Sequence, residues 1–272
     1  MPALFITGVS GYLGSELARL AAPDWSVSGS VLSSGAPAGV RAHRLDVRDA
    51  TALRAALATE RPDAVVHTAY RQSGEGAEAI TANGAETVAR AARAAGARLV
   101  HLSSDLVFSG RAGRPLREDD PPDPLPGYGR WKAQAEGMVS AAHPDALLVR
   151  TSLIYGGAEL SRHEQLALDA TRNPELTLFD DELRCPVAAG DLARALLQLT
   201  STELSGPLHV AGADAVSRLE FGRLIAGRHG RDPDSIRGAP GGPERPKDCR
   251  LDSSRAQALL ATRLRGAREV LG

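Results

Sequence analysis

Short apolar segments alternate with longer amphipathic, alanine-rich segments in the N-terminal half of the chain. Six short runs predict β-strands at Ala3–Thr7, Ser26–Val31, Arg41–Leu45, Ala64–Thr68, Leu99–Ser103 and Leu147–Arg150. The segments between them predict helices at Leu13–Ala22, Thr51–Ala58, Ile80–Ala95 and Tyr128–Ala142. Strands that alternate with helices form parallel βαβ units. The pattern therefore predicts an α/β fold with a doubly wound parallel sheet, whose ligands bind outside the carboxyl ends of the strands.

The C-terminal half has a looser pattern. It predicts helices at Arg162–Thr171, Asp191–Leu199 and Leu219–Arg228 and strands at Leu176–Phe179 and Leu208–Ala211. Proline and glycine predict loops at Arg117–Pro126 and Arg237–Pro246. We therefore expect one domain over residues 1–155 and a smaller, mainly substrate-binding lobe over residues 156–272. The helix near residues 190–200 is expected to pack back onto the first domain.

Composition and charge exclude several classes of partner. The net charge is −1, so the chain has no basic surface suited to nucleic acid or an anionic membrane. No apolar run reaches the length of a membrane span. The N-terminal MPALFITG leads directly into a strand, whereas a secretory signal would have a basic region followed by a longer apolar stretch. Cys185 and Cys249 lack the spacing of a metal site or a disulfide framework. We expect a cytoplasmic protein without a metal centre.

A glycine-rich turn, Thr7–Gly14, follows the first predicted strand and opens a helix. Gly8 allows a tight turn, Gly11 lets the backbone approach a pyrophosphate, and Gly14 permits close packing of helix on strand. A flexible turn is the alternative, but a strand before the glycines and a helix after them favour dinucleotide binding. The sequence thus predicts a Rossmann-type sheet.

The second predicted strand and the residues after it bear on the choice of cofactor. An acid there would bind the adenosine ribose and favour NAD, but Ser28–Ser34 contains none. Since no arginine is expected beside these serines to bind a 2′-phosphate, NADP(H) is only mildly favoured over NAD(H). Asp46 and Val47, after the third strand, are candidates for contacting adenine. The alternative is a cap for the helix at Thr51–Ala58.

The strongest catalytic signal is the pair Tyr128 and Lys132, which helical spacing places on one face. A nearby cation stabilises a phenolate and lowers the pKa of the phenol, which suits tyrosine to proton transfer near neutral pH. Of 32 basic residues only Lys132 and Lys247 are lysines, so Lys132 stands out in a chain that otherwise uses arginine. A solvated helical pair is the alternative.

Hydroxyl groups also gather at predicted strand ends. Ser103, Ser104 and Asp105 end the fifth strand, where a serine could donate a hydrogen bond to a carbonyl oxygen while Tyr128 delivers a proton. The alternative is a cap for the strand end. All four tyrosines, Tyr12, Tyr70, Tyr128 and Tyr155, fall in segments expected to line the crevice.

Several motifs, in this order and spacing, resemble extended short-chain dehydrogenases, and most closely the dTDP-4-dehydrorhamnose reductase family. They are TGVSGYLG, HTAY, SSDLVF, REDDPPDPLPGYG, YGRWK, RTSLIYG and RPKDCRLDSS, and they span nearly the whole chain. The resemblance implies that Ser104, Tyr128 and Lys132 are catalytic and that Lys132 also holds the nicotinamide ribose. It also implies that Ala69 and Tyr70 line the cofactor and that Thr151 lies near the nicotinamide. Together with the glycine turn and the end of the third strand, the predicted cofactor-binding residues are Gly8, Gly11, Tyr12, Leu13, Gly14, Asp46, Val47, Ala69, Tyr70 and Thr151.

Two residues depart from this family. Leu106 stands where rhamnose-type reductases usually carry tyrosine, and Leu153 where they often carry tryptophan. Both positions would face the sugar, so the substrate pocket loses an aromatic surface and a hydroxyl. Leu106 also replaces the acidic residue of the similar dehydratases, which disfavours dehydration. Arg184 and Arg245, each near a proline, are candidates for binding an anionic substrate such as a diphosphate.

The leading hypothesis is NAD(P)H-dependent reduction of a ketone, such as the 4-keto group of a nucleotide-linked sugar. Two alternatives stay open. One is an epimerase with the same catalytic residues and a retained cofactor. The other is a non-catalytic NAD(P)-binding subunit resembling the regulatory subunit of methionine adenosyltransferase. The sequence leaves the oligomeric state open, with a homodimer as one option.

Overall fold

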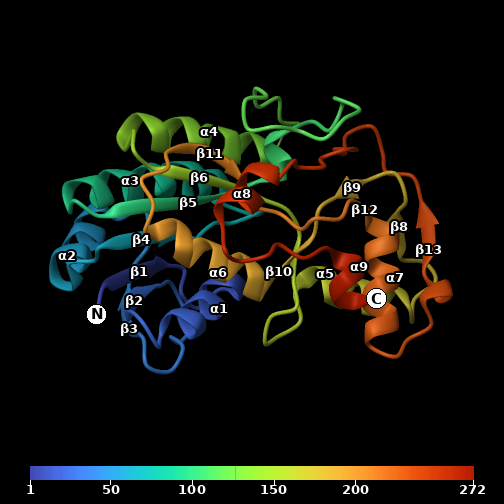
Figure 1. The fold of residues 1–272 in the computed structure, drawn as a ribbon, viewed down its shortest axis with the longest axis horizontal. Coiled ribbons are helices and arrows are strands. Elements are labelled where there is room, and N and C mark those ends of the chain that lie inside the picture. Colours follow the sequence, from blue (N-terminus) through green and yellow to red (C-terminus); the bar gives the residue numbers. More distant parts are fainter. Residues whose placement is uncertain (126) are drawn as a thin grey trace. The chain divides into compact units, whose positions relative to one another are not determined.

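A seven-stranded sheet forms the centre of the computed structural model, which describes residues 1–125 and 127–272 (Figure 1). Its strands are β1 (Ala3–Thr7), β2 (Ser26–Val31), β3 (Arg41–Arg44), β4 (Ala64–His67), β5 (Arg98–Ser104), β6 (Leu147–Thr151) and β11 (Gly206–His209). They lie in the order β11-β6-β5-β4-β1-β2-β3. The pairs β1–β2, β1–β4, β2–β3 and β4–β5 are parallel, as the alternation of strands and helices predicts.

Helices connect these strands and cover the sheet. The main helices are α1 (Tyr12–Ala21), α2 (Ala50–Glu60), α3 (Gly84–Ala94), α4 (Tyr128–Ala142) and α6 (Ala189–Thr200). Leu4, Phe5 and Ile6 of β1 are all buried, so both faces of the sheet are covered. On one face Phe5 and its neighbours pack against α2, α3 and α4, which lie together in Figure 1. The prediction of an α/β, doubly wound sheet is confirmed.

Two details differ from the predicted elements. The sheet has seven strands where six were expected, because β11 joins it although its residues were assigned to the C-terminal lobe. The helix expected at Ile80–Ala95 begins as a wider π-type turn, η1 (Ala79–Asn83), before α3. A widened turn keeps the apolar face of the helix, so the hydrophobic pattern does not reveal it.

The chain divides into two compact units. The first unit comprises Met1–Ser103, Pro126–Val149 and Ala193–Leu208, and the second comprises Ser104–Leu125, Arg150–Leu192 and His209–Gly272. The units interleave along the chain, whereas the domain limits expected from the sequence, 1–155 and 156–272, are continuous. Those limits stay a prediction about where cofactor and substrate bind. Pro126, which ends the expected proline-rich loop, lies outside the described residues.

The second unit contains short paired strands and a core of its own. Its strands are β7 (Ile154–Tyr155), β8 (Thr177–Phe179), β9 (Leu183–Arg184), β10 (Val187–Ala188), β12 (Val216–Ser217) and β13 (Arg237–Ala239). Its helices and single turns are η2 (Asp105–Val107), α5 (Arg162–Ala170), α7 (Arg218–Arg228), η3 (Pro233–Ser235), α8 (Ser254–Leu259) and α9 (Ala267–Leu271). The pairs are β7–β10 and β8–β13, both parallel, and β9–β12, which is antiparallel.

Two expectations about this unit were wrong. The loop expected at Arg237–Pro246 begins with β13, because residues 237–239 keep backbone groups that pair with β8 despite their glycine. Tyr155 does not line a crevice: it is fully buried and packs edge-on against Phe221, with ring centroids 5.3 Å apart. Along the described residues 1–125 and 127–272, no helix has both the length and the apolarity needed to span a membrane.

Candidate active site

The glycine turn lies between β1 and α1 in the first unit. Gly8 has a φ of +67°, a conformation that other residues rarely adopt, and a side chain there would press on Ala69 at 3.1 Å. Gly14 packs so closely against the Gly8 carbonyl that a Cβ would collide with it. The close packing of the start of α1 against the glycine turn therefore requires glycine at positions 8 and 14.

The N-terminus of α1 fits a pyrophosphate. Gly11 is the N-cap, and no side chain caps the backbone N–H groups at this end of the helix. The first turn, from Tyr12 through Leu13 and Gly14, contains no acid that would compensate the positive end of the helix. Such a helix end favours an anion, so the residues present here fit a dinucleotide.

The end of β2 adjoins the glycine turn. The Ser30 hydroxyl accepts a hydrogen bond from the Gly8 N–H at 3.2 Å, and the Ser30 carbonyl accepts one from the Val9 N–H at 3.0 Å. Ser28 is buried as well. Ser30 therefore supports the turn, while the Ser28 hydroxyl donates to the Leu4 carbonyl of β1. Of the serines in Ser28–Ser34, only Ser33 and Ser34, which follow the strand, are exposed.

An arginine that sequence reasoning missed lies beside this strand end. β2 and β3 pair with Val31 opposite Arg44, although these two residues are far apart in the sequence. Arg44 is exposed and has no ion-pair partner among the residues that the structure describes. Two nearby arginines are already paired, Arg41 with Glu60 at 2.7 Å and Arg48 with Asp46 at 2.6 Å. Strand register was the signal needed to find Arg44.

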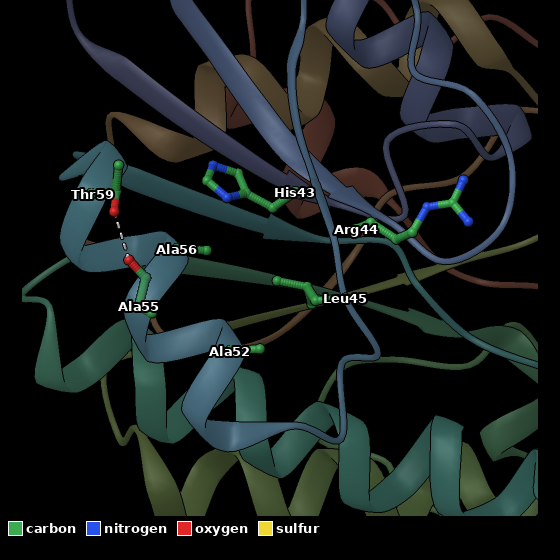
Figure 2. A pocket seen from close by; sticks show the side chains of 7 residues that line it. All are labelled: His43, Arg44, Leu45, Ala52, Ala55, Ala56 and Thr59. Carbon is green, nitrogen blue, oxygen red and sulfur yellow. Dashed lines mark hydrogen bonds between the residues drawn. The ribbon is translucent and has the colours of Figure 1, made fainter.

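A hollow of about 260 Å³ is lined by His43, Arg44, Leu45, Ala52, Ala55, Ala56 and Thr59, whose side chains are drawn in Figure 2. It lies between β3 and α2, and the Arg44 side chain points away from α2. None of the site residues expected from the sequence lines this hollow. It therefore does not mark the candidate site.

Asp46 and Val47 follow β3. Asp46 accepts a bidentate hydrogen bond from Arg48, which lowers its pKa. The cap of α2 is instead Asp49, whose carboxylate accepts from the Thr51 and Ala52 N–H groups, both at 3.0 Å. The alternative of Asp46 as the helix cap is therefore wrong, while its contact with adenine stays a prediction.

Tyr128 and Lys132 lie in the first two turns of α4. The Lys132 side chain is 3% exposed and its Nζ donates a hydrogen bond to the Leu102 carbonyl at 2.7 Å. Nζ also lies 5.3 Å from the ring centre of Tyr70, and the Tyr70 and Tyr128 rings are 5.5 Å apart. The alternative of a solvated helical pair is wrong for Lys132. Tyr70, Tyr128 and Lys132 thus lie together in one cluster.

The surroundings of Lys132 are polar but uncharged at neutral pH, apart from Glu136. Burial lowers the pKa of Lys132 to about 8, which Glu136 opposes. The imidazoles of His67 and His101 stack at 5.1 Å, and burial together with the Lys132 charge keeps both pKa values far below the ordinary value, that of His67 at about 3. Glu136 accepts a hydrogen bond from Ser103 at 2.5 Å. The ammonium thus lies mainly among neutral groups, with the buried Glu136 as a nearby charge of opposite sign.

Ser104 ends β5 and belongs to the second unit. Its hydroxyl accepts a hydrogen bond from the Leu106 N–H at 3.2 Å and donates one to Asp105 Oδ1 at 3.1 Å. The expected capping role is therefore present, and a catalytic role stays a prediction. Asp105 is buried and also accepts a hydrogen bond from Ser152 at 2.6 Å. Burial raises the pKa of Asp105 above its usual range, which Arg184 opposes.

Three further residues predicted for the site belong to the second unit. Thr151 ends β6, Leu153 follows β6, and Leu106 follows β5. Thr151 is buried, and its hydroxyl donates to the Val210 carbonyl at 2.7 Å. Leu153 is partly buried against the core of this unit, and Leu106 is partly buried in η2. Their contacts with cofactor or substrate stay predictions.

Arg184 is the most enclosed of the predicted residues. It donates to the carbonyls of Leu183, Pro246 and Lys247 at 2.8–2.9 Å. Its guanidinium also lies 3.7 Å from Asp105 and 3.5 Å from Glu182. These partners occupy its donors, so the structure favours a supporting role over direct contact with substrate.

Arg245 is more open. Its side chain is 42% exposed, pairs with the fully buried Glu182, and lies 4.2 Å above the Phe179 ring. Sequence reasoning missed Glu182, the carboxylate that contacts both arginines, because an isolated acid carries no motif.

Both cysteines are buried in the second unit. Cys185 and Cys249 point their thiols at the carbonyls of Leu251 and Phe108. Burial raises the pKa of Cys185 to about 11 and that of Cys249 to about 12.

A glycine turn after β1, a helix N-terminus suited to a dinucleotide, and a tyrosine–lysine helix define the class as an NAD(P)-dependent oxidoreductase of the extended short-chain dehydrogenase/reductase type. A family model described as "RmlD substrate binding domain" matches residues 2–272. The chain is 33% identical to a dTDP-4-dehydrorhamnose reductase of Mycobacterium tuberculosis, over 86% of this chain and 78% of that protein. The chain therefore belongs to the dTDP-4-dehydrorhamnose reductase family.

Solved structures agree with this assignment. A hypothetical dTDP-4-dehydrorhamnose reductase from Sulfolobus tokodaii is 30% identical, with a TM-score of 0.82 and 97% of each chain covered. A dTDP-4-dehydrorhamnose reductase from Bacillus anthracis, solved in complex with NADP, has a TM-score of 0.84 and covers 100% of this chain and 98% of its own, but at 24% identity it supports the fold alone.

Proposed function

We propose that this protein reduces the 4-keto group of a nucleotide-linked deoxysugar with NAD(P)H, and that Tyr128, Lys132 and Ser104 are its catalytic residues. The relatives named above are dTDP-4-dehydrorhamnose reductases, which supports the substrate class. The observation that carries the proposal is the burial of Lys132 next to Tyr70 and Tyr128. A buried ammonium without a carboxylate contact is costly, so a functional reason for it is expected.

The catalytic residues would divide the work as follows. NAD(P)H supplies the hydride to the carbonyl carbon when it is bound. Tyr128 donates its phenolic proton to the carbonyl oxygen, so the ketone becomes an alcohol and the phenol a phenolate. Lys132 stabilises that phenolate because its compact charge is fixed in the same cluster. Ser104 donates a hydrogen bond to the oxygen as negative charge develops on it.

We propose further that NADPH binds more tightly than NADH, and Arg44 supports this more strongly than the missing acid does. Arg44 lies opposite Val31, the last residue of β2, and the exposed Ser33 and Ser34 follow that strand. A free guanidinium suits a phosphate monoester such as the 2′-phosphate of NADPH.

The substrate pocket is proposed to include Leu106, Leu153 and Arg245. The two leucines offer an apolar surface where relatives of the rhamnose type carry aromatic residues, so the sugar would be held here by aliphatic contacts. Arg245 is exposed enough to contact a diphosphate. Arg184 would instead hold Asp105 in place without contacting the substrate.

The decisive test is turnover of two probes, dTDP-4-dehydrorhamnose and dTDP-4-keto-6-deoxyglucose, with NADPH and then NADH. We expect loss of reduced cofactor and a sugar product heavier by two hydrogen atoms in mass spectrometry. Isomerisation without net cofactor oxidation would instead indicate the epimerase. Cofactor binding without any change in either sugar would contradict the reductase proposal and favour a regulatory subunit.

A further inference from the structure

The Ser104 hydroxyl has a single proton, and the structure gives that proton to a carboxylate. Ser104 Oγ donates to Asp105 Oδ1 at 3.1 Å while its lone pairs accept from the Leu106 N–H at 3.2 Å. A serine that must donate to a substrate carbonyl therefore already has a partner for its proton. The neighbouring carboxylate controls where this hydroxyl points.

Asp105 is itself fixed from the other side. Its Oδ2 accepts from the Ser152 hydroxyl at 2.6 Å and lies 3.7 Å from Arg184 Nε. Ser152 in turn accepts from the Cys185 N–H at 3.2 Å. Both Asp105 and Arg184 are almost fully buried, and Arg184 is clamped by three backbone carbonyls. A buried carboxylate held at one oxygen presents the other in a fixed direction.

We propose that Asp105 is a positioning residue for the reduction: it holds the Ser104 hydroxyl in one orientation, and Arg184 and Ser152 hold Asp105. Ser104 then needs only to turn its proton from Asp105 Oδ1 to the ketone oxygen when substrate binds. Arg184 acts on the reaction through Asp105 and not by touching the substrate. This inference rests on the proposed reductase function.

The first test is a double-mutant cycle with dTDP-4-dehydrorhamnose and NADPH. Asp105→Ala and Ser104→Ala should each lower kcat/KM about tenfold to a hundredfold, the range for a lost charge-assisted hydrogen bond. The fall should be in kcat, with NADPH affinity unchanged. Because Asp105 acts through Ser104, the double variant should be within about twofold of Ser104→Ala alone. Multiplicative losses would overturn the proposal, because a merely structural role gives that result.

Asp105→Asn tests whether a folding defect explains the loss of activity in Asp105→Ala. It keeps the size of the side chain and one acceptor oxygen, so it should fold as the wild type does and recover part of the activity lost in Asp105→Ala. Asp123 provides a matched control, since it accepts hydrogen bonds from the Ser109 N–H and hydroxyl in the same unit. Asp123→Ala should show no coupling to Ser104→Ala.

A readout independent of turnover separates this inference from the proposed function. The carbon-13 signal of the Asp105 carboxyl, assigned by its loss in Asp105→Asn, should move in Ser104→Ala and in Ser152→Ala but not in Ser109→Ala. If neither probe sugar is reduced, the reductase proposal fails and this signal still tests the link. If the Asp105 signal does not move in Ser104→Ala, the inference is overturned, whether or not the protein reduces either sugar.

Discussion

In the first unit the buried cation Lys132 faces a backbone carbonyl and neutral imidazoles, whereas in the second unit Arg184 is buried against two carboxylates. The pKa of Lys132 is lowered by burial to about 8, so that this side chain can change its charge near neutral pH. An arginine stays charged at any accessible pH.

This difference separates a cation suited to catalysis, Lys132, from one that holds neighbouring groups in place, Arg184. A cation that is incompletely compensated can stabilise a nearby phenolate, because no carboxylate in hydrogen-bonding contact neutralises it. A cation enclosed by carboxylates and carbonyls is neutralised, and its value is that it fixes their positions. The comparison therefore predicts that variants of the first kind lose activity and keep their stability, whereas variants that remove a charge around Arg184 lose stability, whatever they also lose in activity through Asp105.

The largest effect is expected for Tyr128→Phe. It removes the proposed proton donor but keeps the ring next to Tyr70, so kcat should fall by roughly a hundredfold to ten thousandfold. NADPH affinity, measured by calorimetry, should stay within about twofold, because the proton donor is not proposed to hold the cofactor. Near-normal turnover in this variant would rule out the proposed role of Tyr128.

In the second unit, Glu182→Leu should destabilise the protein. Glu182 is fully buried between Arg184 and Arg245, and removal of one member of a buried ionic cluster costs about 3–5 kcal/mol in the free energy of unfolding. Urea unfolding followed by circular dichroism measures this loss. Asp181→Asn, which affects the more exposed pair with Lys247, is the matched control and should cost much less, because about a third of each side chain is open to solvent. Equal losses in the two variants would contradict the contrast.

The third prediction concerns pH. Since burial lowers the pKa of Lys132 to about 8, the ammonium is charged below that pH and lost above it. The activity for ketone reduction should therefore fall as pH rises through about 8. Lys132→Arg should have lower activity at pH 7, by about tenfold or more, because its planar fork does not reproduce the ammonium contact. It should also lose the pH-dependent fall between pH 7 and 9, because arginine stays charged. An unchanged profile would show that another group causes the decline.

The smallest effect concerns the adenosine end. Arg44→Ala should weaken NADPH binding about tenfold and leave NADH binding unchanged, since only NADPH carries the 2′-phosphate. Calorimetric titration of both cofactors measures the two affinities. Arg41→Ala is a suitable control because Arg41 is paired with Glu60. Equal weakening of both cofactors would disprove the phosphate contact.

The sequence predicts the first unit well because its signals are local. Strand, glycine turn and helix follow one another directly, and Tyr128 and Lys132 are one helical turn apart, so spacing alone indicates the chemistry. Arg44 escaped notice because it meets Val31 only through strand register. The cap of α2 is likewise Asp49, and not Asp46, for which a cap was the alternative interpretation.

In the second unit the important contacts join distant segments. Arg184 meets Asp105 and the carbonyls of residues 246 and 247, and Glu182 meets Arg245. Such clusters depend on tertiary packing, so hydrophobic periodicity cannot reveal them. For the same reason Tyr155, which the motif suggested for the crevice, belongs to the core.

The two buried thiols have a practical consequence. Thiol reagents attack the thiolate, and Cys185 and Cys249 are shielded from solvent and have pKa values of about 11 and 12. The native protein should therefore resist alkylation, and its rate of labelling should report opening of the second unit. A cysteine introduced at the exposed Ser34 would then be the only fast-reacting site. A fluorophore attached there could follow cofactor binding directly.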